Sequence, residues 1–467
     1  MSLSDDRAAL PRLLELARAE AERFLGALDE QPVAHRVPRI DPLGLPDAGL
    51  GAEGALEQLR ARYAPWMSGS AGPRYFAFVT GGTTPAALVG DWLTAAYDQN
   101  LADAGESASR QLTLHAIAMF RALLGVPDSF DGALVTGATA SAITAMATAR
   151  QWVGRQRGVD AAAEGVHAIG PVRVLSGTPH ASVFKALSVT GMGRNALRVV
   201  PTLPGREAVD VDALADALAR VETEGEGPAI VVANAGTVNT GDFDDLAAVA
   251  ALRARFSFWL HVDGAFGAVA AASPRYRDRL AGIESADSLT VDGHKWLNVP
   301  YESGVIFTRH QGLEGEVFRS AGAYLPATPT PDTFIHLTPE NSQRLRALPL
   351  WMTLAAYGRA GYAEVVERCC DAAAWLGGRI GAHPGLRLLA PVRLNVVCFT
   401  LAEADGQARP AAEVQAFLDR LAADGAAFLT PTTYAGVPAA RIAVSNWRTT
   451  RADAERTWAA MERALAG

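Results

Sequence analysis

Three reactive or charged side chains follow apolar runs that are typical of β-strands. Asp263 ends one run with a carboxylate, Lys295 follows another with an amine, and His180 follows a third with an imidazole. A carboxylate in an apolar setting needs a cationic or N–H partner. A lysine flanked by apolar neighbours is suited to lose its proton and attack a carbonyl carbon, and an imidazole can lie flat on a ligand ring. Taken singly, Asp263 could be a helix N-cap, and Lys295 and His180 ordinary surface residues.

Residues 136–141, Thr-Gly-Ala-Thr-Ala-Ser, join a further strand to a helix. Free backbone amides at a helix start bind phosphate, and small side chains let it approach. Such turns are common, so the segment means little alone. The carboxyl ends of the strands in an open α/β sheet face one crevice, however. A phosphate cradle, a carboxylate and an amine are together the groups that pyridoxal 5'-phosphate (PLP) requires, and the sequence therefore predicts a PLP site.

The elements around these segments alternate short apolar or β-branched runs with helical patterns. This alternation predicts an α/β fold with a mostly parallel central sheet and helices on both faces. The expected strands are Ala133–Thr136, Val172–Ser176, Ile230–Ala233, Phe256–Val262 and Val305–Thr308, with helices at Ser141–Arg150 and Val211–Val221.

The later part of the chain changes character. Residues 318–341 contain four prolines, which predicts a long irregular loop. A helix is expected over Leu345–Tyr357. Beyond residue 385, the pattern predicts a small α+β domain, with strands at Asn395–Leu401 and Arg441–Val444 and helices at Ala411–Ala422 and Ala452–Ala466.

The N-terminal region predicts one long amphipathic helix. Apolar residues recur at helical spacing, namely Leu10, Leu14, Ala17, Ala21, Phe24 and Leu28. This stripe needs a covering surface, and two alternatives stand equally: packing on the same chain, or packing across a dimer.

Composition excludes several classes of protein. The 467 residues carry a net charge of −8, which is too acidic for a groove that follows nucleic-acid phosphates. Hydrophobic residues make up 49% and charged residues 20%, as in ordinary globular proteins. No apolar run is long enough for a membrane span, and the acidic start does not resemble a signal peptide, so a cytoplasmic location is expected. The three cysteines fit neither a disulfide framework nor a zinc site, and no metal is predicted.

At this point the sequence resembles the group II PLP-dependent decarboxylases, which include the aromatic-L-amino-acid, histidine and glutamate decarboxylases. The matching stretches are PRYFAFV (73–79), TGAT (136–139), PHASVFKA (179–186), AGTVNTGDFDDL (235–246), WLHVDGAFGA (259–268), ADS and DGHKWLNVP within 286–300, SQRLRALPLW (342–351) and RIAVSNWRTT (441–450). They follow the family's order over nearly the whole chain. HVDGAFG, with HKW about thirty residues later, is the most specific signal.

The resemblance implies a role for each site residue. Lys295 would carry the Schiff base, Asp263 would pair with the pyridine nitrogen, and His180 would stack on the ring. Tyr324, in the Pro-rich loop, would protonate the carbanion after CO2 leaves. The implied cofactor-binding residues are Ala138, Thr139, Ala140, His180, Thr237, Asp263, His294 and Lys295, and the implied substrate-pocket residues are Phe78, Val79 and Thr80.

The resemblance also implies an aspartate-aminotransferase-like fold (PLP-dependent transferase type I) and a homodimer with its active site at the interface. We expect an N-terminal helical segment at 1–72, a large PLP-binding domain at 73–345 and a small C-terminal domain at 346–467. The implied reaction is decarboxylation of an L-amino acid, with an aromatic or apolar side chain slightly favoured. The alternatives are another PLP chemistry (aldehyde synthase, aminotransferase or lyase) and a catalytically silent PLP-binding homologue.

Three positions depart from the aromatic enzymes. Val238 replaces a threonine, Asp292 replaces an asparagine near the phosphate, and Ala140-Ser141 replaces the usual Ser-Glu. Two ionised groups of like charge repel, so Asp292 is expected to point away from the phosphate. These departures leave the cofactor prediction intact and weaken any transfer of substrate identity.

Overall fold

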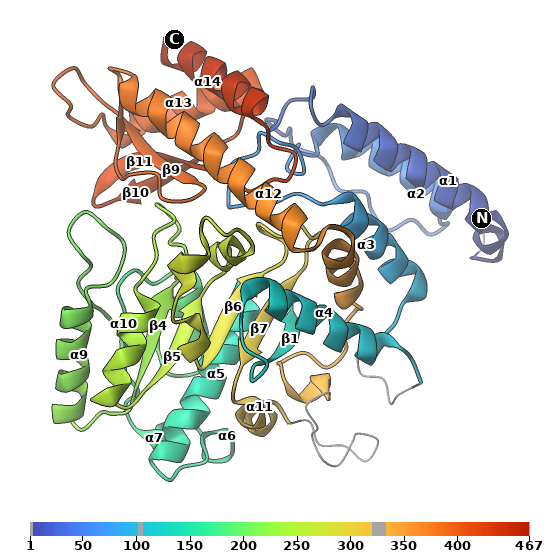
Figure 1. Cartoon of the computed structure of the whole chain (residues 1–467). Coiled ribbons are helices and arrows are strands. Elements are labelled where there is room, and N and C mark those ends of the chain that lie inside the picture. Colours follow the sequence, from blue (N-terminus) through green and yellow to red (C-terminus); the bar gives the residue numbers. More distant parts are fainter. Residues whose placement is uncertain (1–2, 101–105, 320–332, 467) are drawn as a thin grey trace.

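The computed structural model describes residues 3–100, 106–319 and 333–466, and two β-sheets organise the chain (Figure 1). The large sheet has seven strands in the order β1-β7-β6-β5-β4-β2-β3. Its strands are β1 (Asp131–Val135), β2 (Val174–Ser176), β3 (Leu197–Val199), β4 (Ala229–Asn234), β5 (Phe258–Asp263), β6 (Ser288–Asp292) and β7 (Gly304–Thr308). The pairings among β3, β2, β4, β5 and β6 are parallel, and β7 is antiparallel to both β6 and β1.

The predicted strands are confirmed to within about two residues at each end. They are nearly continuous apolar runs because both faces of the sheet are covered; every residue of β4 and of β6 is buried. Helix α5 packs on β6 and β7 and contacts α8 and α11, whereas α4 contacts α12. The short strand β3 was not predicted, because three partly exposed residues give no periodic signal.

The helices that precede the C-terminal sheet follow the expected alternation. They are α1 (Leu3–Ala27), α2 (Gly51–Arg62), α3 (Pro85–Tyr97), α4 (Ser109–Leu124), α5 (Ala138–Gln156), α6 (Ala161–Glu164), α7 (Val166–Ile169), α8 (Ala181–Val189), α9 (Val211–Thr223), α10 (Leu246–Ala251), α11 (Gln311–Phe318) and α12 (Ala347–Ala382). The helix predicted over Leu345–Tyr357 is the first part of α12, which continues beyond a break at Gly358, where φ is +54°.

A four-stranded sheet forms the centre of the predicted C-terminal α+β domain, whereas the sequence predicts only two strands there, at Asn395–Leu401 and Arg441–Val444. Its order is β10-β11-β9-β8, and all of its pairings are antiparallel. The elements are β8 (Leu386–Leu388), β9 (Val396–Leu401), α13 (Ala411–Asp424), β10 (Thr430–Tyr434), β11 (Val437–Ala443) and α14 (Arg451–Ala466). Figure 1 shows α12 running between this domain and α3.

The N-terminal helices α1 and α2 pack on each other at the periphery (Figure 1). Neither helix has a buried residue. Leu10 and Leu14 of the predicted stripe are exposed, and Leu28, just beyond α1, is buried. Packing on the same chain therefore leaves half of the stripe, namely Leu10, Leu14 and Ala17, exposed.

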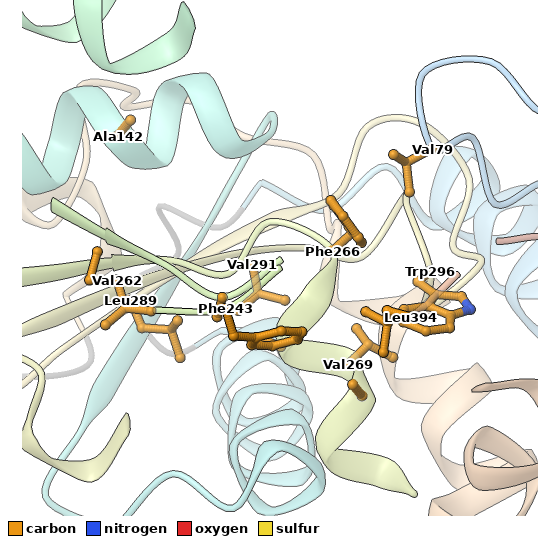
Figure 2. Packing of buried hydrophobic residues seen from close by; sticks show 14 of the residues in the cluster. Val79, Ala142, Phe243, Val262, Phe266, Val269, Leu289, Val291, Trp296 and Leu394 are labelled. Carbon is orange, nitrogen blue, oxygen red and sulfur yellow. The ribbon is translucent and has the colours of Figure 1, made fainter. Parts of the chain in front are cut away.

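The main core lies between the large sheet and its helices. Figure 2 shows part of it, with Val262, Leu289 and Val291 from adjacent strands and Trp296 near Leu394 and Val269. All three cysteines are buried and free. Within the described ranges, no helix combines the length and the apolar character needed to cross a membrane.

Candidate active site

Lys295 lies in the turn that joins β6 to β7, and its amine is paired with Asp292. Nζ of Lys295 lies 2.9 Å from Oδ2 of Asp292, and the side chains are 18% and 2% exposed. Burial lowers the pKa of Lys295, but the Asp292 carboxylate, helped by Asp263, outweighs it and raises the pKa above its ordinary value. One expectation is therefore wrong for this arrangement, because the Lys295 amine is not poised to lose its proton. Asp292 points toward this amine, and its orientation relative to the phosphate stays a prediction.

Asp263 ends β5 and is within electrostatic reach of both Lys295 and His180. Its Oδ1 accepts a hydrogen bond from the backbone N–H of Ala265 at 3.1 Å. This bond closes a local turn and occupies one carboxylate oxygen, but Asp263 is not a helix N-cap, because the next helical turn begins at Gly267 with Phe266 as its N-cap. The half-buried carboxylate is therefore fixed at the end of its strand, beside the lysine.

His180 is the N-cap of α8. Its Nδ1 accepts from the backbone N–H of Ser182 at 3.2 Å and lies 2.8 Å from the Ser182 hydroxyl. Nδ1 is thus engaged by the start of the helix. Surrounding protein lowers the pKa of His180 by desolvation, and Asp263 opposes this shift only in part. The imidazole is therefore neutral near pH 7 and available as a flat, exposed ring.

The predicted phosphate cradle lies where β1 enters α5, close to His294. A Cβ added at Gly137 would lie 2.9 Å from Cε1 of His294, and one added at Gly304 would lie 2.5 Å from Cα of Gly137. Three segments thus meet where there is no room for side chains. The amides of Ala138, Thr139 and Ala140 are in the first turn of α5, where backbone N–H groups lack helical acceptors.

The turn that carries Lys295 is held by two other parts of the chain. A Cβ added at Gly81 would lie only 1.7 Å from the carbonyl oxygen of Lys295. Asn298 donates to the Ser445 carbonyl at 3.1 Å, and the Ser445 hydroxyl donates to the Thr80 carbonyl at 3.2 Å. The segment before α3 and the C-terminal domain therefore both fix this turn.

The predicted pocket residues divide into two groups. Val79 and Thr80 are buried next to the lysine turn, whereas Phe78 is exposed. Phe78 and Val79 both have positive φ angles, 55° and 59°, a conformation that costs free energy for such side chains. The backbone therefore turns sharply here.

Thr237 belongs to a buried polar cluster. Its hydroxyl donates to Oε2 of Glu207 at 2.5 Å, and Glu207 also accepts from Thr240. Neither the position nor the spacing of Glu207 indicated this role. The hydroxyl of Thr237 is engaged by protein, so any contact with a ligand comes from another part of the residue or needs a change of partner.

Arg441 is a site residue that the sequence analysis did not single out. It is buried on β11, donates from Nη1 to the Val238 carbonyl at 2.8 Å, and has no partner for Nε. Its charge acts on the pKa of His180. The sequence signal that could have identified it is a single arginine in the otherwise apolar run Arg-Ile-Ala-Val. Tyr324, the predicted proton donor, lies outside the described residues.

A cavity of about 760 Å³ lies elsewhere, between α12, the start of α3 and the segment after β11. Thr84, Tyr357 and Trp447 are among the residues that line it. Lys295, Asp263 and His180 are not, so this cavity is distinct from the cluster described above.

Comparison with known proteins identifies the chain. Residues 35–402 match the family model described as the pyridoxal-dependent decarboxylase conserved domain. The chain belongs to this family. It is accordingly a PLP-dependent amino-acid decarboxylase, a carboxy-lyase whose cofactor is PLP.

The family's members differ in substrate and product. The chain is 30% identical to an aromatic-L-amino-acid decarboxylase from Bacillus atrophaeus, over 70% of this chain and 67% of that protein. It is 28% identical to an L-2,4-diaminobutyrate decarboxylase from Rhizobium meliloti (83% and 76% covered) and 23% identical to a phenylacetaldehyde synthase from Arabidopsis thaliana (93% and 91% covered).

Solved structures confirm the predicted fold. The structure of Oryza sativa TDC with PLP and tryptamine superposes with a TM-score of 0.89 at 22% identity and covers 98% of each chain. Mouse CSAD gives a TM-score of 0.88 at 23% identity, with 99% of each chain covered.

The residues of this decarboxylase fit PLP. A hydrogen-bond donor of a ligand fits Oδ1 of Asp292, which is buried without a hydrogen-bond partner. The phosphate, which is an acceptor, fits the free backbone amides at the start of α5 instead. The cradle at Gly137 excludes side chains, and the Lys295 amine is held next to Asp263 and Asp292. When bound, PLP supplies an electron sink for the charge left at the α-carbon when CO2 departs.

Proposed function

We propose that the cluster around Lys295 is the active site. Lys295 attaches the cofactor covalently, Asp263 holds a proton at the pyridine nitrogen, and His180 lies on the ring. The first turn of α5 (Ala138, Thr139 and Ala140) and His294 hold the phosphate, and Thr237 lies beside the cofactor. The observation that carries this proposal is the convergence of the Lys295–Asp292 pair, Asp263 and the open start of α5.

We propose that the substrate is an L-amino acid with an aromatic or other apolar side chain, converted to its amine and CO2. The segment Phe78–Thr80 supports this choice, because it offers apolar atoms beside the lysine turn. Similarity to aromatic-L-amino-acid decarboxylases also supports it.

Aldehyde formation is a second candidate, supported by the phenylacetaldehyde synthase that matches 93% of the chain. That reaction consumes O2 and water and releases aldehyde, CO2, ammonia and hydrogen peroxide. The proposed proton donor Tyr324 favours the amine, because rapid protonation of the α-carbon leaves less time for reaction with oxygen. Tyr324 remains an assignment from the sequence.

Product analysis tests these proposals together. The PLP-loaded protein is incubated in air with L-tryptophan, L-tyrosine, L-phenylalanine, L-2,4-diaminobutyrate and L-glutamate, and amine, aldehyde, ammonia and peroxide are quantified. Amine and CO2 in equal amounts from an aromatic substrate support the proposal. Aldehyde with peroxide supports the second candidate, and turnover of diaminobutyrate or glutamate alone contradicts the proposed substrate class.

We further propose a homodimer in which residues 1–72 pack on a second copy. The exposed Leu10 and Leu14 leave an apolar stripe uncovered, and Phe78 and Tyr301 expose aromatic surface near the proposed site. Light scattering after size exclusion tests the dimer, and Leu14→Glu is expected to shift it toward monomer; a monomeric wild-type enzyme would contradict the proposal. The cytoplasmic location stays a prediction from the sequence.

A further inference from the structure

The imidazole of His294 is fixed by its surroundings. Its Nδ1 accepts from the backbone N–H of Ser303 at 3.1 Å, so the remaining ring proton is on Nε2. Nε2 lies 3.5 Å from Oδ2 of Asp292, and Cε1 lies close to Gly137 at the start of α5. Nε2 therefore lies next to both Asp292 and the cradle where the phosphate is proposed to lie.

The short segment after Lys295 also covers one face of this ring. Tyr301 stacks on His294 with ring centroids 4.4 Å apart and planes inclined by 28°. Tyr301 is 59% exposed, so burial in the core does not fix its position. The backbone N–H of His294 also donates a hydrogen bond to the Ser303 carbonyl at 3.1 Å. Whatever holds residues 301–303 therefore holds His294.

Arg346 is the anchor for this segment. It stands at the start of α12, and its side chain is only 6% exposed. Nε and Nη2 donate to Oε1 of Glu302 at 3.1 and 2.7 Å. The same guanidinium donates to Glu340 at 3.0 and 3.2 Å and to Gln343 at 3.1 Å. One buried cation thus joins two carboxylates from separate segments.

Loss of this cation would release the segment. Glu302 and Glu340 would face each other without a positive charge between them, and like charges in a partly buried setting repel. Glu302 lies between Tyr301 and Ser303, so its displacement acts on both contacts of His294. Arg344, two residues earlier, pairs with Asp91 at 2.9 Å, is 39% exposed and makes no such link.

We propose that Arg346 is a positioning residue for the phosphate end of the cofactor, acting through Glu302 and the Tyr301–Ser303 segment on His294. The inference rests on the proposed placement of the phosphate at His294. It predicts an effect that depends on the phosphate group, because within the part of the chain that the structure describes His180, Asp263 and Lys295 form no hydrogen bond or ion pair with Arg346 or Glu302. The affinity for pyridoxal, which lacks the phosphate, should not depend on Arg346.

The test compares the affinity of the full-length, cofactor-free enzyme for PLP and for pyridoxal, by fluorescence titration. Arg346→Gln and Glu302→Gln are each expected to lower the affinity for PLP about tenfold, which corresponds to the loss of one hydrogen bond to a charged group. Both variants should leave pyridoxal affinity within about twofold. Tyr301→Ala should behave like them, and Tyr301→Phe should retain PLP affinity because it keeps the stacked ring. Arg344→Gln is the matched control and should change neither affinity.

His294→Gln separates the inference from the proposal beneath it. This variant should lower the affinity for PLP but not for pyridoxal. Adding Arg346→Gln to it should lower the PLP affinity by no more than about a further twofold, since both substitutions act through the His294 imidazole. If His294→Gln leaves the ratio of PLP to pyridoxal affinity unchanged, the phosphate placement is wrong and the inference falls with it. If His294→Gln acts but Arg346→Gln does not, or Arg346→Gln weakens both ligands equally, only the positioning role is overturned.

Discussion

Removing the Lys295 amine should destabilise the cofactor-free protein. The Lys295→Ala variant leaves Asp292 without its cation, and the Asp292 side chain is only 2% exposed. Breaking a buried pair from one side costs about 3–5 kcal/mol, because a buried charge is left uncompensated. His294 Nε2, 3.5 Å from the same carboxylate oxygen, offers partial compensation. We therefore expect a loss near the lower limit, about 3 kcal/mol in the free energy of unfolding.

A second substitution shows whether the loss of stability comes from the unpaired Asp292 carboxylate. In Lys295→Ala/Asp292→Asn no unpaired charge remains, and we expect most of the stability to return. Asp292→Asn alone should cost less, about 1 kcal/mol, since Lys295 is partly exposed and can release its proton. The resulting coupling energy isolates the pair from the separate effects of each change.

The assay is urea unfolding followed by far-ultraviolet circular dichroism at one protein concentration, after removal of PLP by dialysis against hydroxylamine. Cofactor removal matters because bound PLP would stabilise the wild type by mass action. Lys185→Ala provides the control, since Lys185 is the only other lysine in the sequence and is exposed. The reasoning is refuted if Lys295→Ala is as stable as the wild type, or if the double variant is no more stable than Lys295→Ala.

Three other predictions follow from separate features. Gly137→Ala should weaken PLP affinity at least tenfold without unfolding the protein, because its Cβ would lie 2.9 Å from His294; unchanged affinity in a PLP titration would contradict the proposed cradle. Burial lowers the pKa of His261 to about 4; the folded protein therefore binds fewer protons than the unfolded chain below pH 6.5, and stability falls as the pH drops toward 4. Between pH 7 and pH 5 the wild type should lose about 2 kcal/mol more than His261→Gln in urea unfolding, and equal losses would show that His261 is not the titrating group. Tyr324→Phe should increase the yield of aldehyde and peroxide relative to amine, measured as the product ratio in air; a ratio unchanged from the wild type would remove Tyr324 as the proton donor.

The fold was largely predictable because its signals are local. Runs such as Ala229–Asn234 and Phe258–Asp263 are mostly apolar, and the helical patterns between them are regular. The antiparallel β7 and the break of α12 at Gly358 were not predictable in this way. Pairing direction and helix breaks depend on contacts between distant segments.

The candidate site shows the same division. Asp263, Lys295 and His180 could be found because Asp263 ends an apolar run and the other two closely follow one. The partner of Lys295 could not, because the pairing with Asp292 depends on the conformation of a four-residue turn. Glu207, Arg346 and Arg441 reach the site region from distant parts of the sequence, and Arg346 joins carboxylates at positions 302 and 340. Such contacts exist only after the chain has folded.

The most direct test of the central claim is the position of the cofactor's covalent attachment. The sequence has two lysines, so borohydride reduction of the PLP-loaded enzyme followed by peptide mass spectrometry has only two side chains to distinguish, apart from the chain's N-terminal amine. The account predicts the reduced pyridoxyl group on Lys295, and a Lys295→Ala variant that carries no such group and releases no CO2 from any L-amino acid. A modification confined to Lys185, or CO2 release that survives in Lys295→Ala, would contradict it.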